Sequence, residues 1–282
     1  MKTLTKLALG AGCLLALPPL LLAPGRASKG KRAPFAGRNF AHRGLYTADQ
    51  QVPENSLTAF RLAVEAGYGM ELDVQLSRDG EVMVFHDETL DRICFVPGRV
   101  EELDSAVLRR LPLCGTGETL PRLAEVLELV AGRTPLIVEL KTGARRRELC
   151  EKTLALLRRY GGPVCVESFD PRIVAWFRFH APELLRGQLA QTPAAFRQAG
   201  MGRAESFLLG HTLLNIAARP AFIAYRIGPR PRTVRFAELL GAMRVGWTAH
   251  SPAAERGRDA VIFEFYRPAP RYRGKPEQEE QL

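Results

Sequence analysis

Charged side chains interrupt several apolar, strand-like runs in the first half of the chain. Glu71 and Asp73 lie two positions apart in one such run, so both side chains leave the same face of a strand. Two carboxylates this close repel each other unless a cation joins them. Glu139, in a later apolar run, supplies a third oxygen ligand. A set of carboxylates favours a hard cation, so these three residues predict a site for Mg²⁺ or Ca²⁺.

Two histidines and two basic residues stand at or near the ends of the same runs. His42 and Arg43 follow an apolar run that begins near Asn39, His86 follows Val82-Met83-Val84-Phe85, and Lys141 follows the run that contains Glu139. A buried charge without a partner is costly, so these groups imply partners or a bound metal. Imidazole titrates near neutral pH, which makes His42 and His86 candidates for general base and general acid.

Six motifs in a fixed order resemble those of the glycerophosphodiester phosphodiesterase family. They occupy residues 42–44, 53–60, 71–74, 84–87, 138–141 and 167–170. The resemblance is unbroken from about Asn39 to Asp170, and six ordered motifs are far more specific than any one of them. It implies that His42 and His86 are the catalytic pair and that Glu71, Asp73 and Glu139 are the metal ligands.

The remaining site residues would bind the substrate. A phosphodiester carries negative charge, which the cation, Arg43 and Lys141 would neutralise, with Arg43 suited to bidentate contact. Val245-Gly246-Trp247-Thr248 resembles the family's late Trp-Thr motif, and we expect Trp247 to form a wall of the pocket.

Apolar runs that suit strands alternate with stretches that suit helices, which is the pattern of a parallel α/β protein. Six strands are expected before residue 191, over residues 39–42, 68–74, 82–85, 136–140, 164–169 and 186–190. The connection between the second and third is too short for a crossover helix. The resemblance implies an α/β fold, a TIM-type (β/α)8 barrel over 39–267, with a small insertion after the third strand and a shortened last βα unit.

The chain ends differ in composition from this domain. Leu4 to Pro24 is mostly apolar and long enough to cross a bilayer, so residues 1–25 are a signal segment or, as we favour, a single-pass membrane anchor. Basic residues after the run favour a cytoplasmic catalytic domain, whereas cleavage of the segment would make it a secreted one. Residues 26–38 read as a basic linker and residues 268–282 as a disordered tail.

The overall composition fits a folded soluble domain. The 282 residues are 46% hydrophobic and 25% charged, with a net charge of +10. The net positive charge would favour binding to an anionic membrane surface. Because the sequence contains no nucleic-acid-binding motif, no nucleic-acid partner is expected. The five cysteines form no CxxC pair and no zinc spacing. The oligomeric state is left open.

These features predict a metal-dependent enzyme that hydrolyses glycerophosphodiesters to an alcohol and glycerol 3-phosphate. One alternative is a lysophospholipase D that takes lysophospholipids from the membrane, and another is a phospholipase C-like or sphingomyelinase D-like enzyme on a related barrel. A non-catalytic phospholipid-binding protein is disfavoured, because all five metal and acid-base residues are present.

Overall fold

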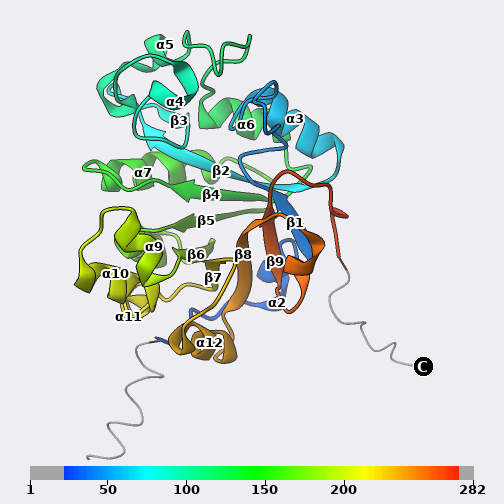
Figure 1. Cartoon of the computed structure of the whole chain (residues 1–282), viewed down its shortest axis with the longest axis vertical. Coiled ribbons are helices and arrows are strands. Elements are labelled where there is room, and N and C mark those ends of the chain that lie inside the picture. The colour runs from blue at the N-terminus through cyan, green and yellow to red at the C-terminus, as the bar shows by residue number, and fades with distance from the viewer. Residues whose placement is uncertain (1–21, 273–282) are drawn as a thin grey trace, which may run out of the picture.

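The computed structural model describes residues 22–272, which form a closed barrel of eight parallel strands (Figure 1). The strands of the barrel are β1 (Arg38–Ala41), β2 (Gly69–Leu76), β4 (Leu136–Leu140), β5 (Val164–Ser168), β6 (Leu185–Ala190), β7 (Phe222–Arg226), β8 (Met243–Ala249) and β9 (Ala260–Phe263). Strand β1 pairs in parallel with both β9 and β2, which closes the ring. The predicted TIM-type barrel is therefore confirmed.

Helices connect most of these strands on the outside of the barrel. They are α3 (Leu57–Glu65), α6 (Leu123–Val130), α7 (Arg146–Leu157), α8 (Pro171–His180), α9 (Pro193–Gln198), α10 (Arg203–Gly210), α11 (Asn215–Ala218) and α12 (Arg232–Leu239). The strands are apolar on both faces, because one face lines the barrel interior and the other packs on helices. Only the 3₁₀ helix η2 (Pro252–Glu255) joins β8 to β9, as the predicted shortened last unit requires.

Strand β3 (Val82–Val84) lies outside the barrel, because it pairs antiparallel with β2. The short connection between these two strands forms a hairpin instead of a crossover, as the sequence predicts. The small insertion follows β3 and contains α4 (Asp91–Cys94), η1 (Val100–Glu102) and α5 (Ser105–Leu108). It has a small apolar core of its own that includes Phe85, Leu90 and Leu108.

Both flanks of the barrel are more ordered than the sequence predicts. The stretch expected to be a linker carries helix α2 (Lys29–Arg32), and Phe35 stacks on Phe40 of β1 at a centroid distance of 6.2 Å. At the other end, the Pro270 carbonyl accepts a hydrogen bond from the Asn39 amide, and Tyr272 donates one to Gly37. The prediction that the chain is disordered from residue 268 is therefore wrong for residues 268–272, because these residues pack beside the start of β1 at the base of the barrel. The rest of the tail prediction lies outside the described residues.

Almost all of the predicted anchor, residues 1–21 of 1–25, also lies outside the described residues. Within residues 22–272, no helix combines the length and the apolar character needed to span a bilayer. The chain joins the described part beside the end of α11, where Arg219 donates a hydrogen bond to the Ala23 carbonyl at 3.2 Å. Gly25 donates another to the Pro220 carbonyl.

Helix α3 begins at a side-chain cap that also fixes the loop leading into the site. The Ser56 hydroxyl accepts a hydrogen bond from the Ala59 amide at 3.1 Å and donates one to the Pro53 carbonyl at 2.7 Å. Both groups are buried, so the cap satisfies polar atoms that water does not reach.

Replacing this cap is expected to destabilise the barrel. Ser56→Ala leaves the Ala59 amide and the Pro53 carbonyl without their partner and should lower the free energy of unfolding by about 1 kcal/mol. Chemical denaturation followed by circular dichroism measures the difference. Ser251→Ala is the matched control, because Ser251 precedes η2 without making a capping hydrogen bond. Equal stabilities of the two variants would contradict the prediction.

Candidate active site

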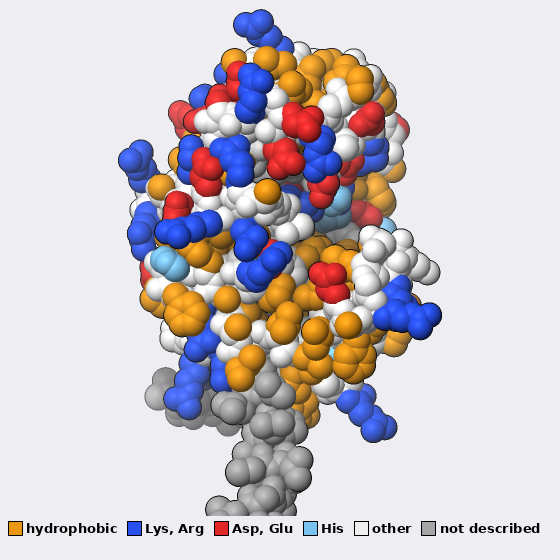
Figure 2. All heavy atoms as spheres, turned by 90° about the vertical axis from the view of Figure 1, so that its left-hand side faces the viewer, with side chains coloured by type: hydrophobic (Ala, Val, Ile, Leu, Met, Phe, Trp, Pro, Cys, Tyr) orange, Lys and Arg blue, Asp and Glu red, His pale blue; other side chains and the backbone are white. Residues whose placement is uncertain are grey.

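A cavity of about 530 Å³ opens at the carboxyl ends of the barrel strands. The arrows of β2, β4 and β5 in Figure 1 point towards the face that Figure 2 shows. His42, Glu71, His86 and Glu139 line the cavity together with Arg43 and Trp247. Catalytic groups of TIM barrels lie at this end, because the loops that follow the strands converge there.

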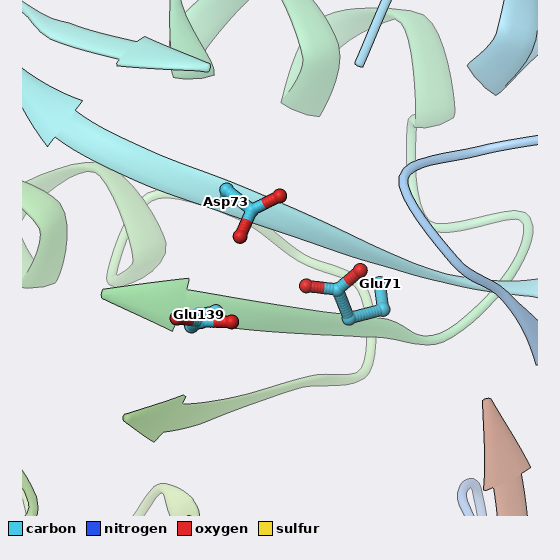
Figure 3. Close-up of side chains that lie close together, drawn as sticks. All are labelled: Glu71, Asp73 and Glu139. Carbon is cyan, nitrogen blue, oxygen red and sulfur yellow. The ribbon is translucent and has the colours of Figure 1, made fainter. Parts of the chain in front are cut away.

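The three predicted ligand carboxylates converge beside this cavity (Figure 3). Glu71 and Asp73 extend from β2 and Glu139 from β4, and all three are buried. One oxygen of each lies within 4.8 Å of one from each of the others. The register of the strands brings these side chains together, because Asp73 and Glu139 are direct partners in the parallel pairing of β2 and β4. The geometry fits a hard cation with oxygen ligands.

Two basic residues partly compensate these charges. The Lys141 ammonium lies 2.9 Å from Glu139 Oε1 and 3.2 Å from Asp73 Oδ1. The Arg43 amide donates a hydrogen bond to Glu71 Oε2 at 3.1 Å, and the Arg43 guanidinium lies 3.5 Å from Asp73 Oδ2. Lys141 and Asp73 are not among the residues that line the cavity. Lys141 instead borders a second cavity of about 270 Å³.

The compensation is uneven across the cluster. Burial raises the pKa of Glu71 well above its usual range, and the neighbouring charges of Asp73 and Glu139 add to that effect. Burial opposes ionisation of Asp73 too, but Lys141, His86 and Arg43 outweigh it and hold the pKa of Asp73 well below its ordinary value. The cluster accordingly holds negative charge that a proton or a metal cation can neutralise.

His42 is oriented by a carboxylate at the end of β9. Its Nδ1 lies 2.8 Å from Glu264 Oε2, which also accepts a hydrogen bond from the Tyr46 hydroxyl at 2.8 Å. This contact favours the proton on Nδ1 and leaves Nε2, 3.9 Å from Glu71 Oε2, able to accept one. Burial lowers the pKa of His42, and the hydrogen bond to Glu264 partly offsets the decrease. The neutral imidazole suits a general base.

His86 is held by a network that crosses to the first strand. Its Nδ1 lies 2.5 Å from Asp87 Oδ1, and Arg92 binds the same carboxylate at 2.6 Å. Burial opposes ionisation of Asp87, but the hydrogen bonds from His86 and Arg92 prevail and lower the pKa of Asp87. Arg92 also binds Glu54 at 2.7 Å, as does Arg43.

Trp247 lines the cavity. Its ring meets the edge of Phe169 at a centroid distance of 5.5 Å, and its indole nitrogen donates a hydrogen bond to the Ala224 carbonyl at 3.1 Å. The structure therefore brings all eight predicted site residues into one region, with Asp73 and Lys141 outside the lining of the cavity.

Sequence reasoning missed Glu264, Tyr46 and Arg92 as parts of the site. For Glu264 a signal existed, because it follows the apolar run Ala260–Phe263 as His42 and His86 follow theirs. Tyr46 and Arg92 lie in loops and a short helix, where spacing gives no indication of which residues they face.

Comparison with known proteins identifies the family of this chain. The family model described as "Glycerophosphoryl diester phosphodiesterase family" matches residues 42–265. A glycerophosphodiester phosphodiesterase from Caldanaerobacter subterraneus subsp. tengcongensis is 35% identical over 163 residues, which cover 54% of this chain and 65% of that protein. The match thus spans less than two thirds of that relative.

Two further proteins are similar to parts or most of this chain. Human lysophospholipase D GDPD1 is 31% identical over 143 residues, covering 46% of this chain and 44% of that protein. The structure of an Oleispira antarctica phosphodiesterase in complex with the product sn-glycerol-3-phosphate superposes with a TM-score of 0.67 at 24% identity. That superposition covers 82% of this chain and 94% of the other.

The contact between His42 and Glu264 predicts a change in titration. Glu264→Gln removes a hydrogen bond and a negative charge that both raise the pKa of His42, so this pKa should move to lower pH. An NMR pH titration of the His42 ring, recorded with chelator present, measures the shift. Glu128→Gln, on the exposed side of α6, serves as the control. An unchanged or higher pKa in Glu264→Gln would refute the contact.

Proposed function

Because this chain belongs to the glycerophosphoryl diester phosphodiesterase family, we propose that it hydrolyses glycerophosphodiesters to an alcohol and glycerol 3-phosphate. The observation that carries the proposal is that His42 and His86 line the same cavity as two members of the buried carboxylate triad, Glu71 and Glu139. A phosphodiesterase needs positive charge for the phosphate and two groups that exchange protons, and this arrangement supplies both.

Glu71, Asp73 and Glu139 would hold a divalent cation, Mg²⁺ or Ca²⁺. Their oxygens are close enough to share one ion, and hard oxygen ligands suit either metal. When bound, the cation neutralises phosphate charge and polarises the phosphorus–oxygen bond.

The side chains of the chain itself would move the protons and orient the phosphate. His42 Nε2 accepts a proton from the attacking oxygen, while Glu264 on the other side of the ring stabilises the imidazolium that forms. His86 donates a proton to the leaving alcohol, and Asp87 fixes its ring. Arg43 faces the cavity and binds a phosphate oxygen. Lys141 keeps two carboxylates close together and adds positive charge behind them.

Paired variants test the assignment of roles. Glu71→Gln keeps the shape of the side chain but removes a ligand charge, and should lower turnover of glycerophosphocholine by at least roughly 10³-fold with weakened cation binding. His86→Ala should slow turnover by roughly 10²-fold to 10⁴-fold while cation affinity stays near normal.

The measurements are steady-state kinetics and calorimetric titration with Mg²⁺ and with Ca²⁺ after chelation. Full activity of Glu71→Gln would remove it from the ligand set. Loss of cation binding in His86→Ala would move that histidine into the coordination shell. A wild-type chain that hydrolyses no glycerophosphodiester with either cation would refute the proposed reaction.

Exposed apolar residues favour lysophospholipase D activity as a second candidate. Phe207, Leu208, Leu214 and Ile216, on and between α10 and α11, form a set that we call the apolar patch. In Figure 2 hydrophobic side chains gather on the lower half of the face that carries the cavity. Ala23, near the end of the apolar segment 4–24, accepts a hydrogen bond from Arg219 at the end of α11. A bilayer that holds this segment would therefore lie near the apolar patch. We also propose that this segment anchors the protein in a membrane, with the barrel on the cytoplasmic side.

The patch predicts a difference between lipid and water-soluble substrates. Phe207 is 52% exposed, and Phe207→Ser should reduce hydrolysis of lysophosphatidylcholine in anionic vesicles by roughly tenfold, because a bilayer would bury the ring. Hydrolysis of soluble glycerophosphocholine should not change. Val107→Ser, an exposed residue of α5, is the control. An equal effect on both substrates would exclude a membrane role for the patch.

A further inference from the structure

Glu167 lines the catalytic cavity, yet the proposed reaction gives it no role. It lies on β5 directly beside Glu139 in the parallel pairing of β4 and β5. It borders the same cavity as His42, Glu71 and Glu139. The residue is only 2% exposed, so its carboxyl group has exchanged water for the surroundings that the barrel provides.

Those surroundings leave the carboxyl group without a hydrogen bond. Neither Oε1 nor Oε2 of Glu167 has a partner among the residues that the structure describes. The other buried carboxylates of the cluster all have one: Glu139 binds Lys141, Asp73 binds Asn55, and Glu71 binds the Arg43 amide. A buried carboxyl group without a hydrogen-bond partner lowers the stability of the fold. We therefore expect a bound ligand to supply the missing interaction.

The missing partner is best explained as the cation of the neighbouring triad. Arg43 is already paired with Glu54, and Lys141 with Asp73 and Glu139. Glu167 lies outside the group whose oxygens fall within 4.8 Å of one another. A glutamate has three rotatable side-chain bonds, so the Glu167 carboxylate can adopt several staggered positions beside Glu139, its neighbour in the sheet.

We propose that Glu167 is a fourth carboxylate of the cation site and shifts the preference of that site towards Ca²⁺. The inference rests on the cation site of the proposed function. Ca²⁺ accepts about six to eight oxygen ligands in flexible geometry, whereas Mg²⁺ demands an octahedron and retains several waters. A fourth carboxylate therefore benefits Ca²⁺ more than Mg²⁺, which binds well with fewer protein ligands.

Calorimetric titration of the chelator-treated full chain tests the proposal without reference to catalysis. Glu167→Gln should weaken Ca²⁺ binding by roughly tenfold to 100-fold and change Mg²⁺ binding by less than about threefold. Glu128→Gln, an exposed α6 residue, should change neither affinity. Affinities of Glu167→Gln within about twofold of wild type for both cations would overturn the proposal, as would an equal loss for both.

Thermal denaturation without cations separates a role of Glu167 in cation binding from a role in stabilising the fold. Glutamine has the shape of glutamate without its charge, so cation-free Glu167→Gln should melt at the wild-type temperature or above it. A lower melting temperature would assign Glu167 a structural role instead. A wild-type chain that binds neither cation would refute the cation site of the proposed function itself. A chain that binds Ca²⁺ without hydrolysing glycerophosphodiesters would refute only the reaction.

Discussion

Burial of several carboxylates at one end of the barrel is the constraint on which the rest of the site depends. Like charges in a low-dielectric interior repel strongly, so the fold must supply opposite charge within a few ångströms. Lys141 does so for Asp73 and Glu139, and the Arg43 backbone amide and guanidinium do so for Glu71 and Asp73. Compensation is partial, and the proposed cation would complete it.

The same balance links the small insertion to the barrel. Arg92 lies in α4 of the insertion and binds Asp87 beyond β3 and Glu54 before α3. Glu54 in turn binds Arg43 at the end of β1. The two histidines are thus fixed by carboxylates on different elements, Asp87 for His86 and Glu264 for His42. Their meeting in one cavity is a property of the closed barrel rather than of either strand.

Much of the architecture was predictable because apolar runs in a parallel barrel are buried on both faces and stand out in the sequence. The predicted strand 136–140 coincides with β4. The flanks were not predictable in this way. Phe35 and Tyr272 pack on the base of the barrel, and a single aromatic residue in a polar stretch does not reveal which surface it will cover.

The amino-acid sequence by itself determined which chemical groups are present and which of them share a strand face, because the alternation of side chains along a strand fixes that locally. It therefore gave Glu71 and Asp73 as a pair and placed His42 and His86 at strand ends. Only the tertiary structure decided that Glu264 turns towards His42 and that Glu167 has no partner among the described residues. The first fact depends on the pairing of β1 with β9, two strands far apart in the chain that closure of the barrel brings together. The second depends on which side chains the neighbouring strands β4 and β6 place around Glu167.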